Sequence, residues 1–300
     1  MPELPQGVEG VVEVRVHRGT SSRWLLIEIP HGATRKSDYD AVASRLKSAL
    51  PADLDHFFFV NTDVGTAEGA EVLGRALSAR GINVAVARCL IPRTFIDTNR
   101  VLGQTTQGVV KDGLTPAVPG YIDAPADAEW LIAQHGRYHE VVAALYRELC
   151  GAASGLALQL HSFSPRSVEI EKTDAGIVAA LHAAYVPEVY AKWPERPPVD
   201  LISATADGSF RAAPGLNAAL LAAYRADGIA AAENATYHLH PVTMGLHYAR
   251  QFPEQVVCVE LNRGLVAEPF VPFGVSPISE AKVSRMVAPI ERVLGAALLG

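Results

Sequence analysis

Short apolar runs alternate along the chain with longer segments in which apolar residues recur every three or four positions. The short runs predict strands at 11–17, 23–30, 56–63, 83–90, 155–163, 199–206 and 255–263. The longer segments predict helices at 38–50, 66–81, 128–152, 175–192, 215–226, 242–250 and 279–299. Strands that alternate with helices are typical of a largely parallel sheet covered on both faces. We therefore expect an α/β fold with a mostly parallel, mixed central sheet and helices on both faces.

The alternation continues along the chain without a visible domain boundary. No internal repeat, low-complexity tract or clear linker interrupts it, so residues 1–300 are expected to form one domain. Residues 101–125 are rich in Gly and Pro and predict a long loop over one face of the sheet. Hydrophobic residues make up 49% of the chain and charged residues 19%, which is enough apolar material for a substantial core.

Charge and cysteine usage restrict the kind of partner and compartment. The net charge of −6 and the pI near 5.9 argue against binding to nucleic acid or anionic membranes, which usually needs a basic surface. The three cysteines have no metal-like spacing and fit thiols in a reducing compartment. The first residues lack the apolar core of a signal peptide, and no apolar run is long enough for a membrane span. The sequence therefore predicts a cytoplasmic protein and leaves its oligomeric state open.

Polar side chains follow most of the predicted strands where each strand ends. In open α/β sheets, ligands bind just beyond these carboxyl ends. The residues concerned are His31 after 23–30, Asp63 after 56–63, Arg93, Asp97, Asn99 and Arg100 after 83–90, His161 in 155–163, and Glu260 in 255–263. We expect them to gather at one edge of the sheet and to form a binding or catalytic site.

The residue types in this set suit metal-assisted hydrolysis. Two histidines and a carboxylate can bind a catalytic zinc ion and leave a position for water. Bound zinc lowers the pKa of water to about 7, and Glu260 is positioned to act as general base and acid. One arginine could stabilise a developing oxyanion, and another with an asparagine could bind a substrate carboxylate. The same ligand set also suits iron or other divalent ions.

Six stretches, taken in order, carry a family resemblance. They are IPHGAT (29–34), NTDVGTAEGAEVL (61–73), RTFIDTNR (93–100), YHEVVAALYREL (138–149), LHSFSPR (160–166) and VVCVELNR (256–263). At these stretches the chain resembles the N-formylglutamate amidohydrolase (N-formylglutamate deformylase) family, which is related to zinc carboxypeptidases, aspartoacylase and succinylglutamate desuccinylase. The resemblance implies a fold like that of the zinc carboxypeptidases and phosphorylase/hydrolase-like proteins. It also implies a zinc cofactor and hydrolysis of an N-acyl amino acid such as N-formylglutamate, a small carboxylate-bearing substrate.

The resemblance also implies roles for individual side chains. His31, Asp63 and His161 would bind zinc. Glu260 would be the general base, and Arg93 would polarise the carbonyl group. The residues placed with substrate binding are Asn99 and Arg100, which would hold a substrate carboxylate, Asp97, which would orient the arginine pair, and Arg166.

Two departures from the related families leave alternatives open. Zinc carboxypeptidases and aspartoacylases have a carboxylate three residues after the first metal histidine, but here that position is Thr34. Asp63 is our choice for the acidic ligand, with Asp38 and Asp40 as competitors. Leu246 stands where the deformylases have an arginine before a His-Tyr pair, so formylglutamate itself is not fixed as the substrate.

Other readings of the same residues predict different chemistry. A carboxypeptidase or amidase acting on a small peptide would use the same metal site. A catalytically inactive relative would only bind a carboxylate ligand. Ser162 could be the nucleophile of a serine hydrolase, although no G-x-S-x-G motif surrounds it. Glu260 could instead form a buried ion pair with Arg263, and His238 and His240 could form a second metal site on one face of a strand.

Overall fold

The computed structural model describes residues 2–103, 114–152, 155–170 and 172–300. In these residues seven strands form one sheet, in the order β1-β3-β2-β4-β7-β5-β6. The strands are β1 (Val12–His17), β2 (Trp24–Ile29), β3 (Asn83–Cys89), β4 (Leu156–Phe163), β5 (Val199–Leu201), β6 (Ala231–Glu233) and β7 (Val256–Asn262). The four central strands β3, β2, β4 and β7 are parallel, whereas β1 is antiparallel to β3 and β5 to β7. The mixed, mostly parallel sheet that we expected is confirmed.

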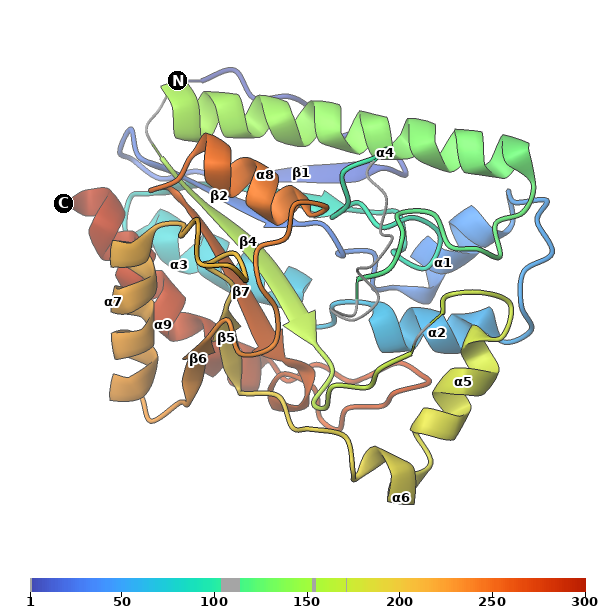
Figure 1. The fold of residues 1–300 in the computed structure, drawn as a ribbon. Helices are drawn as coiled ribbons and strands as arrows, with labels where there is room; N and C mark the ends of the chain where they lie inside the picture. Colours follow the sequence, from blue (N-terminus) through green and yellow to red (C-terminus); the bar gives the residue numbers. More distant parts are fainter. Residues whose placement is uncertain (1, 104–113, 153–154, 171) are drawn as a thin grey trace.

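Helices cover both faces of the sheet (Figure 1). One face is covered by α4 (Pro125–Tyr146) and α8 (Met244–Gln251), with α1 (Lys36–Ala43), α2 (Leu54–Asn61) and α5 (Ile177–Ala184) near the carboxyl ends of the strands. The other face is covered by α3 (Thr66–Ala79), α7 (Pro214–Ala226) and α9 (Glu280–Leu299). No described helix is long and apolar enough to cross a membrane.

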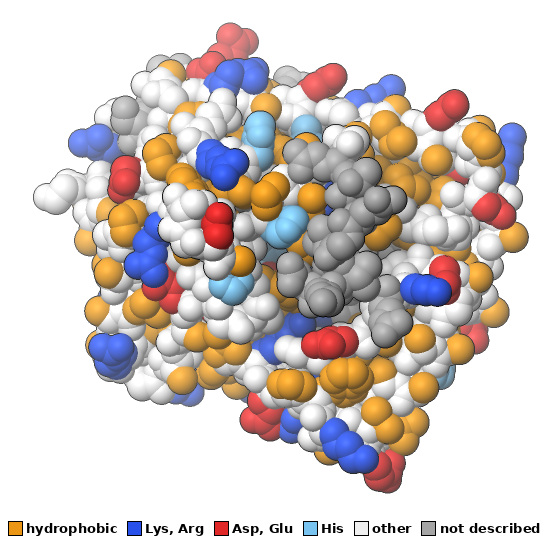
Figure 2. Space-filling view, in the orientation of Figure 1, with side chains coloured by type: hydrophobic (Ala, Val, Ile, Leu, Met, Phe, Trp, Pro, Cys, Tyr) orange, Lys and Arg blue, Asp and Glu red, His pale blue; other side chains and the backbone are white. Residues whose placement is uncertain are grey.

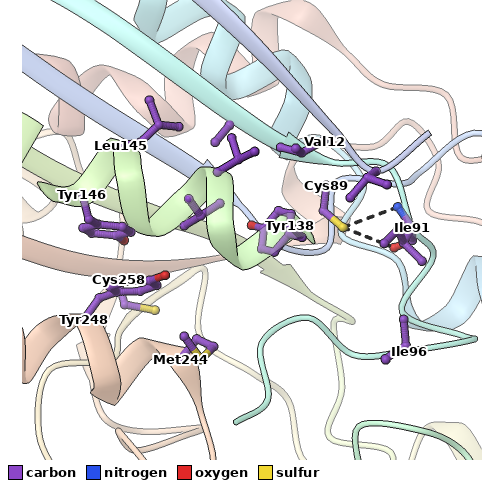
Figure 3. Packing of buried hydrophobic residues seen from close by; sticks show 14 of the residues in the cluster. Val12, Cys89, Ile91, Ile96, Tyr138, Leu145, Tyr146, Met244, Tyr248 and Cys258 are labelled. Atoms are coloured by element: carbon purple, nitrogen blue, oxygen red, sulfur yellow. Dashed lines mark hydrogen bonds between the residues drawn. The ribbon is translucent and has the colours of Figure 1, made fainter. Parts of the chain in front are cut away.

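Strand alternation divides the core into two clusters, one on each face of the sheet. All of β2 is buried, and Leu26 packs on the α4 face whereas Leu25 and Ile27 pack on the α3 face. On the α4 face, Tyr146 stacks on Tyr248 of α8, with ring centroids 3.9 Å apart and planes 8° from parallel (Figure 3). A stack of this kind contributes about 0.5–1.5 kcal/mol beyond the burial of the two rings. It fixes α8 against α4 above the central strands.

A carboxylate, Glu28, is buried within this apolar cluster. Its oxygens accept hydrogen bonds from the hydroxyl groups of Tyr138 and Tyr146, at 3.0 and 2.8 Å, and from Nε2 of Gln159 at 3.0 Å. Burial of a carboxylate is costly unless hydrogen bonds replace its water shell. These three donors therefore tie α4 to the two strands that lead to His31 and His161.

The predicted strand at 56–63 is wrong, because most of this segment forms α2. A short apolar run such as HFFFV does not distinguish a buried strand from a buried helical turn. In the structure α2 packs on α5 and α1, outside the sheet, with Phe58 fully buried and Phe57 and Phe59 half-buried. Asp63 therefore lies between two helices and does not follow a strand.

Other differences concern the ends of elements. The helix predicted at 38–50 ends at Ala43, and the one at 128–152 begins at Pro125 and continues after Tyr146 as a π-helical turn, η2 (Arg147–Ala152). The helix predicted at 175–192 divides into α5 and the short α6 (Pro187–Tyr190), because a residue before proline disfavours helical backbone. The strand at 199–206 is only three residues long, and β6 was not predicted. Part of the loop at 101–125, residues 104–113, lies outside the described residues.

Candidate metal and catalytic site

The four parallel central strands bring most of the candidate residues to one edge of the sheet. His31 follows β2 by two residues, and Asp97 lies in the loop after β3. His161 lies near the end of β4, and Glu260 of β7 is its partner in the strand register. Asp63 reaches the same place from the turn between α2 and α3. The prediction that these side chains gather at the carboxyl ends of the strands is confirmed for the strands β2, β3, β4 and β7.

Three buried side chains converge at this edge: His31, Asp63 and His161. Oδ2 of Asp63 lies 3.3 Å from Nδ1 of His31 and 3.0 Å from Nδ1 of His161. The side chains are 4%, 2% and 4% exposed, and they form the only metal-type cluster of three His, Cys, Asp or Glu residues in the described part of the chain. Ligands at 2.0–2.1 Å from a tetrahedral zinc ion lie about 3.3 Å from each other. The two distances from Oδ2 of Asp63 are close to this spacing, and the ligand atoms of all three side chains lie within 4.8 Å of one another.

The remaining polar atoms of two of these ligands are held by neighbouring side chains. Nε2 of His31 lies 2.8 Å from Oδ1 of Asp97, and Oδ1 of Asp63 lies 3.2 Å from Nη2 of Arg263. Arg263 also donates to the carbonyl oxygens of Ser162, at 2.8 Å, and of Val60. Such outer contacts fix the orientation of a metal ligand and the tautomer of its imidazole. His31 and Asp63 are thus preorganised to present Nδ1 and Oδ2 to the same point.

His31 shows why a cation suits this point. Its two ring nitrogens both face carboxylate oxygens, from Asp63 and from Asp97. A neutral imidazole has a single N–H, so only one of these contacts can be an N–H···O hydrogen bond. If Nε2–H donates to Asp97, the Nδ1 lone pair faces the Asp63 carboxylate, and a cation between them satisfies both. Two imidazoles and a carboxylate are ligands for zinc and for other divalent ions. The residues present fit such an ion.

Electrostatics within the cluster agree with a negatively charged Asp63. Burial works against its charge, but the two histidines outweigh burial and hold the pKa of Asp63 well below its usual value. For His161, burial works against protonation, whereas the hydrogen bond with Asp63 raises its pKa above the usual value. Asp63 therefore stays an anion at neutral pH, as a metal ligand must be.

Asp97 joins the cluster to the segment RTFIDTNR. Besides His31, its oxygens accept a hydrogen bond from the backbone N–H of Asn99 at 2.9 Å, and they pair with Nε of Arg93 at 3.0 Å and Nη2 of Arg100 at 3.1 Å. Burial works against ionisation of Asp97, but Arg100, Arg93 and His31 hold its pKa well below the usual value. One buried carboxylate thus positions a candidate ligand and two arginines.

The chain has relatives both in sequence and in fold. The family model described as N-formylglutamate amidohydrolase matches residues 24–267. The chain belongs to the N-formylglutamate amidohydrolase family. Its fold is similar to that of the N-formylglutamate amidohydrolase from Ralstonia eutropha JMP134, with a TM-score of 0.57 and 18% identity over 95% of this chain and 98% of that one. A gene product from Agrobacterium tumefaciens is also similar, with a TM-score of 0.58 and 19% identity over 96% and 95% of the two chains. No curated protein sequence matches the chain.

Membership of this family confirms the resemblance that the six stretches carry, and the two structures support the fold. The roles of individual side chains depend on this chain's own geometry. Glu260 is half-buried beside His161, and its Oε2 has no hydrogen-bond partner among the described residues. Burial raises the pKa of Glu260, and the nearby His161 opposes this rise. A carboxylate with a raised pKa and a free oxygen is suited to accept a proton.

The two arginines of RTFIDTNR differ in how accessible they are. The side chain of Arg93 is 26% exposed, and among the described residues only its Nε has a hydrogen-bond partner. Arg100 is 3% exposed and donates to the backbone oxygens of Thr115 and Asn99, in addition to its pair with Asp97. In this conformation Arg100 is buried and holds the backbone of the loop that contains RTFIDTNR. Its predicted contact with a substrate carboxylate stays a prediction. Oδ1 of Asn99 accepts from the backbone N–H of Gly245 at 3.3 Å.

Several other candidates have partners outside the cluster. Arg166 pairs with Glu195 at 2.6 Å and donates to the backbone oxygen of Trp193 at 2.6 Å. The competing acidic ligands also lie elsewhere, since Asp38 pairs with Arg88 and Asp40 with Lys36. The hydroxyl group of Ser162 donates to the backbone oxygen of Val64 at 2.9 Å. His238 and His240 lie in irregular backbone and not on a strand.

Two histidines of α4 support the same loop, and sequence reasoning gave them no role. Nε2 of His135 lies 2.9 Å from the carbonyl oxygen of Arg100, and Nε2 of His139 lies 2.8 Å from that of Thr98. Burial, helped by His135, lowers the pKa of His139 to about 3, so this ring is neutral at physiological pH. The two contacts flank Asn99 and hold its backbone. Their spacing of four residues on a predicted helix was the available signal, because it places both rings on one face.

A cavity of about 400 Å³ opens on the other face of the sheet, between α3 and the start of α9. Charged side chains of β1, β3 and α3 line it, and none of the three candidate ligands does. Arg88 lines this cavity, and its Nε donates to the carbonyl oxygen of Gly32 at 2.7 Å, next to His31. The candidate site lies instead at the carboxyl ends of the central strands. Figure 2 shows histidine side chains grouped near the middle of the face that it presents.

Proposed function

We propose that residues 1–300 act as one amidohydrolase domain that uses a divalent metal ion, zinc in the first instance. The substrate would be a small N-acyl amino acid that bears a carboxylate, N-formylglutamate or a close analogue. The observation that carries the proposal is the convergence of His31, Asp63 and His161, with Asp97 and Arg263 behind the ligands. The family to which the chain belongs supports the reaction class.

His31, Asp63 and His161 would hold the ion. When bound, zinc supplies a Lewis acid for the carbonyl oxygen and lowers the pKa of water to about 7. Glu260, beside His161 on the neighbouring strand, would take a proton from the attacking water as the new C–O bond forms. It would return that proton to the amide nitrogen as the C–N bond breaks. Burial raises the pKa of Glu260 and so favours both transfers near neutral pH, whereas the charge of a bound ion acts in the opposite direction.

Arg93 is the candidate for stabilising the oxyanion. Asp97 fixes its Nε, and its two terminal nitrogens have no hydrogen bond to a described residue. A guanidinium held in this way costs little reorganisation when negative charge develops on the carbonyl oxygen. Asn99 and Arg100, with Asp97 as their support, remain our proposal for the α-carboxylate. Arg166 remains a proposed substrate residue further from the metal ligands.

Metal analysis and a formate-release assay test the proposal together. The chain purified without chelator should contain close to one zinc or other divalent ion, and His31→Ala with His161→Ala should contain none. Zinc-loaded wild type should release formate from N-formylglutamate, and Glu260→Gln should retain the metal but lose about 100- to 10,000-fold of the rate. A protein that neither contains nor takes up a divalent ion contradicts the metal site. Cleavage of a dipeptide in preference to N-formyl amino acids would instead favour a carboxypeptidase.

A further inference from the structure

Arg196 lies over the ends of the two strands that carry the proposed catalytic groups. Its guanidinium carbon is 5.2 Å from the ring of Phe163, which ends β4 two residues after His161 and on the same face. Its backbone oxygen accepts a hydrogen bond at 3.2 Å from Nδ2 of Asn262, which ends β7 two residues after Glu260. Arg196 therefore lies at the strand ends, next to residues that follow His161 and Glu260 by two positions.

The guanidinium of Arg196 is held in a fixed orientation but has no counter-charge. Its Nε donates to Oγ of Ser167 at 3.0 Å and its Nη2 to the hydroxyl of Tyr237 at 2.8 Å. The rings of Phe163 and Tyr237 both lie 5.2 Å from its centre. Nη1 has no hydrogen bond to a described residue. The fork is thus preorganised by neutral groups, and one edge of it is free.

The other arginines around the site are paired with carboxylates. Arg93 and Arg100 pair with Asp97, Arg263 with Asp63, and Arg166 with Glu195. Arg196 is half-buried, yet it forms no ion pair within the described part of the chain. A partly desolvated arginine without a counter-charge is unfavourable unless an anion binds it. Its planar fork matches the two oxygens of a carboxylate.

The charge of Arg196 acts on Glu260, the proposed general base. Burial raises the pKa of Glu260, while His161 and Arg196 act in the opposite direction. This direction agrees with the place of Arg196 over the ends of β4 and β7.

We infer that Arg196, held by Tyr237, binds a second carboxylate of the substrate, remote from the amide that is cleaved. The inference rests on the proposed function and names a residue that would select acidic side chains. Two residues of a strand span about 7 Å. In an extended N-acylglutamate the acyl carbon lies about 6 Å from the side-chain carboxylate carbon and about 4 Å from the α-carboxylate carbon, from standard bond lengths. A position two residues beyond His161 along β4 therefore suits the side-chain carboxylate of an N-acylglutamate.

Arg196→Gln, assayed on N-formylglutamate and on its neutral isostere N-formylglutamine, tests this role. We expect kcat/KM on N-formylglutamate to fall about 10- to 100-fold, chiefly through KM, because the contact is present in both ground and transition states. The rate on N-formylglutamine and the metal content should change little, so the preference for the acidic substrate disappears. Arg196→Lys should restore part of the loss, and Tyr237→Phe should lose less than Arg196→Gln. Arg292→Gln, an exposed residue paired with Asp227 on the opposite face, is the matched control.

An equal loss on both substrates, or an unchanged preference, overturns the inference. A binding measurement separates this failure from failure of the proposed reaction. In the Glu260→Gln background, calorimetric titration with N-formylglutamate should give an affinity that Arg196→Gln weakens at least about tenfold. If the zinc-loaded wild type has no hydrolase activity but this difference is found, the carboxylate receptor stands and the reaction is wrong. Equal affinities, or no binding to either protein, refute the receptor.

Discussion

We expect Asp97→Asn, which exchanges one carboxylate oxygen for an NH₂ group, to impair the site strongly. Oδ1 of Asp97 accepts from Nε2 of His31 and the backbone of Asn99, and Oδ2 pairs with Arg93 and Arg100. An asparagine has one oxygen and one NH₂ group in place of two oxygens. Whichever way the amide is turned, one set of donors then faces a donor. The negative charge that compensates the two arginines is lost as well.

The size of the effect follows from burial. Asp97 is 2% and Arg100 is 3% exposed, and removing one partner of a buried ion pair costs about 3–5 kcal/mol of folding free energy. The Arg93 pair adds less, because that side chain is 26% exposed and partly screened by solvent. Loss of the carboxylate behind a metal-binding histidine typically weakens metal affinity about 10- to 100-fold. We expect both effects together in Asp97→Asn.

Denaturant unfolding of the metal-free protein measures the first effect, and zinc competition against a chromogenic chelator measures the second. Asp38→Asn is the matched control, since Asp38 also pairs with a buried arginine, Arg88 at 3.2 Å, but has no contact with a candidate ligand. It should lower stability and leave zinc affinity unchanged. A zinc affinity of Asp97→Asn within about twofold of wild type, or an equal loss in Asp38→Asn, would refute the role given to Asp97.

Further outcomes follow from the same contacts. Because burial raises the pKa of Glu260 in the metal-free protein, an NMR titration of the metal-free protein should place this carboxyl above its ordinary value of 4.5, and titration at or below that value would contradict the effect of burial. Asp63 and Asp97 have pKa values held below the unfolded value of 3.8; their contribution to stability is therefore complete well above pH 4 and is lost as the pH falls below it, which acid unfolding of the metal-free protein should show. Ser162→Ala should lower the free energy of unfolding by about 1 kcal/mol, because the hydrogen bond to the backbone oxygen of Val64 is lost. It should keep hydrolase activity, and inactivation would instead support the serine-hydrolase hypothesis.

The central part of the fold was predictable because its signals are local. Strands β2, β3, β4 and β7 are mostly apolar runs interrupted by a few polar residues, as expected for parallel strands buried on both faces. The segment HFFFV has the same appearance, but it packs on α5, which is distant in sequence, and on the preceding helix α1. The outer strand β6 is only three residues long and owes its place to pairing with β5. Elements fixed by tertiary pairing leave little trace in a local pattern.

The candidate metal ligands were predictable because each ends a recognisable element or lies in a family-like stretch. Asp63 was chosen over Asp38 and Asp40 because it follows the apolar run HFFFV, which was expected to be a strand. The run forms α2, yet Asp63 still reaches His31 and His161 from the turn before α3. Arg196 had no comparable signal. It lies in KWPERPPVD, a proline-rich connection between elements, and only the folded chain brings it over Phe163 and Asn262.

Arg263 shows how the strand period could have corrected one expectation. Because it follows Glu260 closely, the two were expected as a possible buried ion pair. Residues three apart on a strand point to opposite faces, so this pairing was unfavourable from the start. In the structure Arg263 begins the short 3₁₀ turn η3 (Arg263–Leu265) and pairs with Asp63 instead. Oε2 of Glu260 is buried without a hydrogen-bond partner in the described part of the chain. Arg263 thus holds the candidate ligand Asp63 and forms no ion pair with the carboxylate proposed as the base.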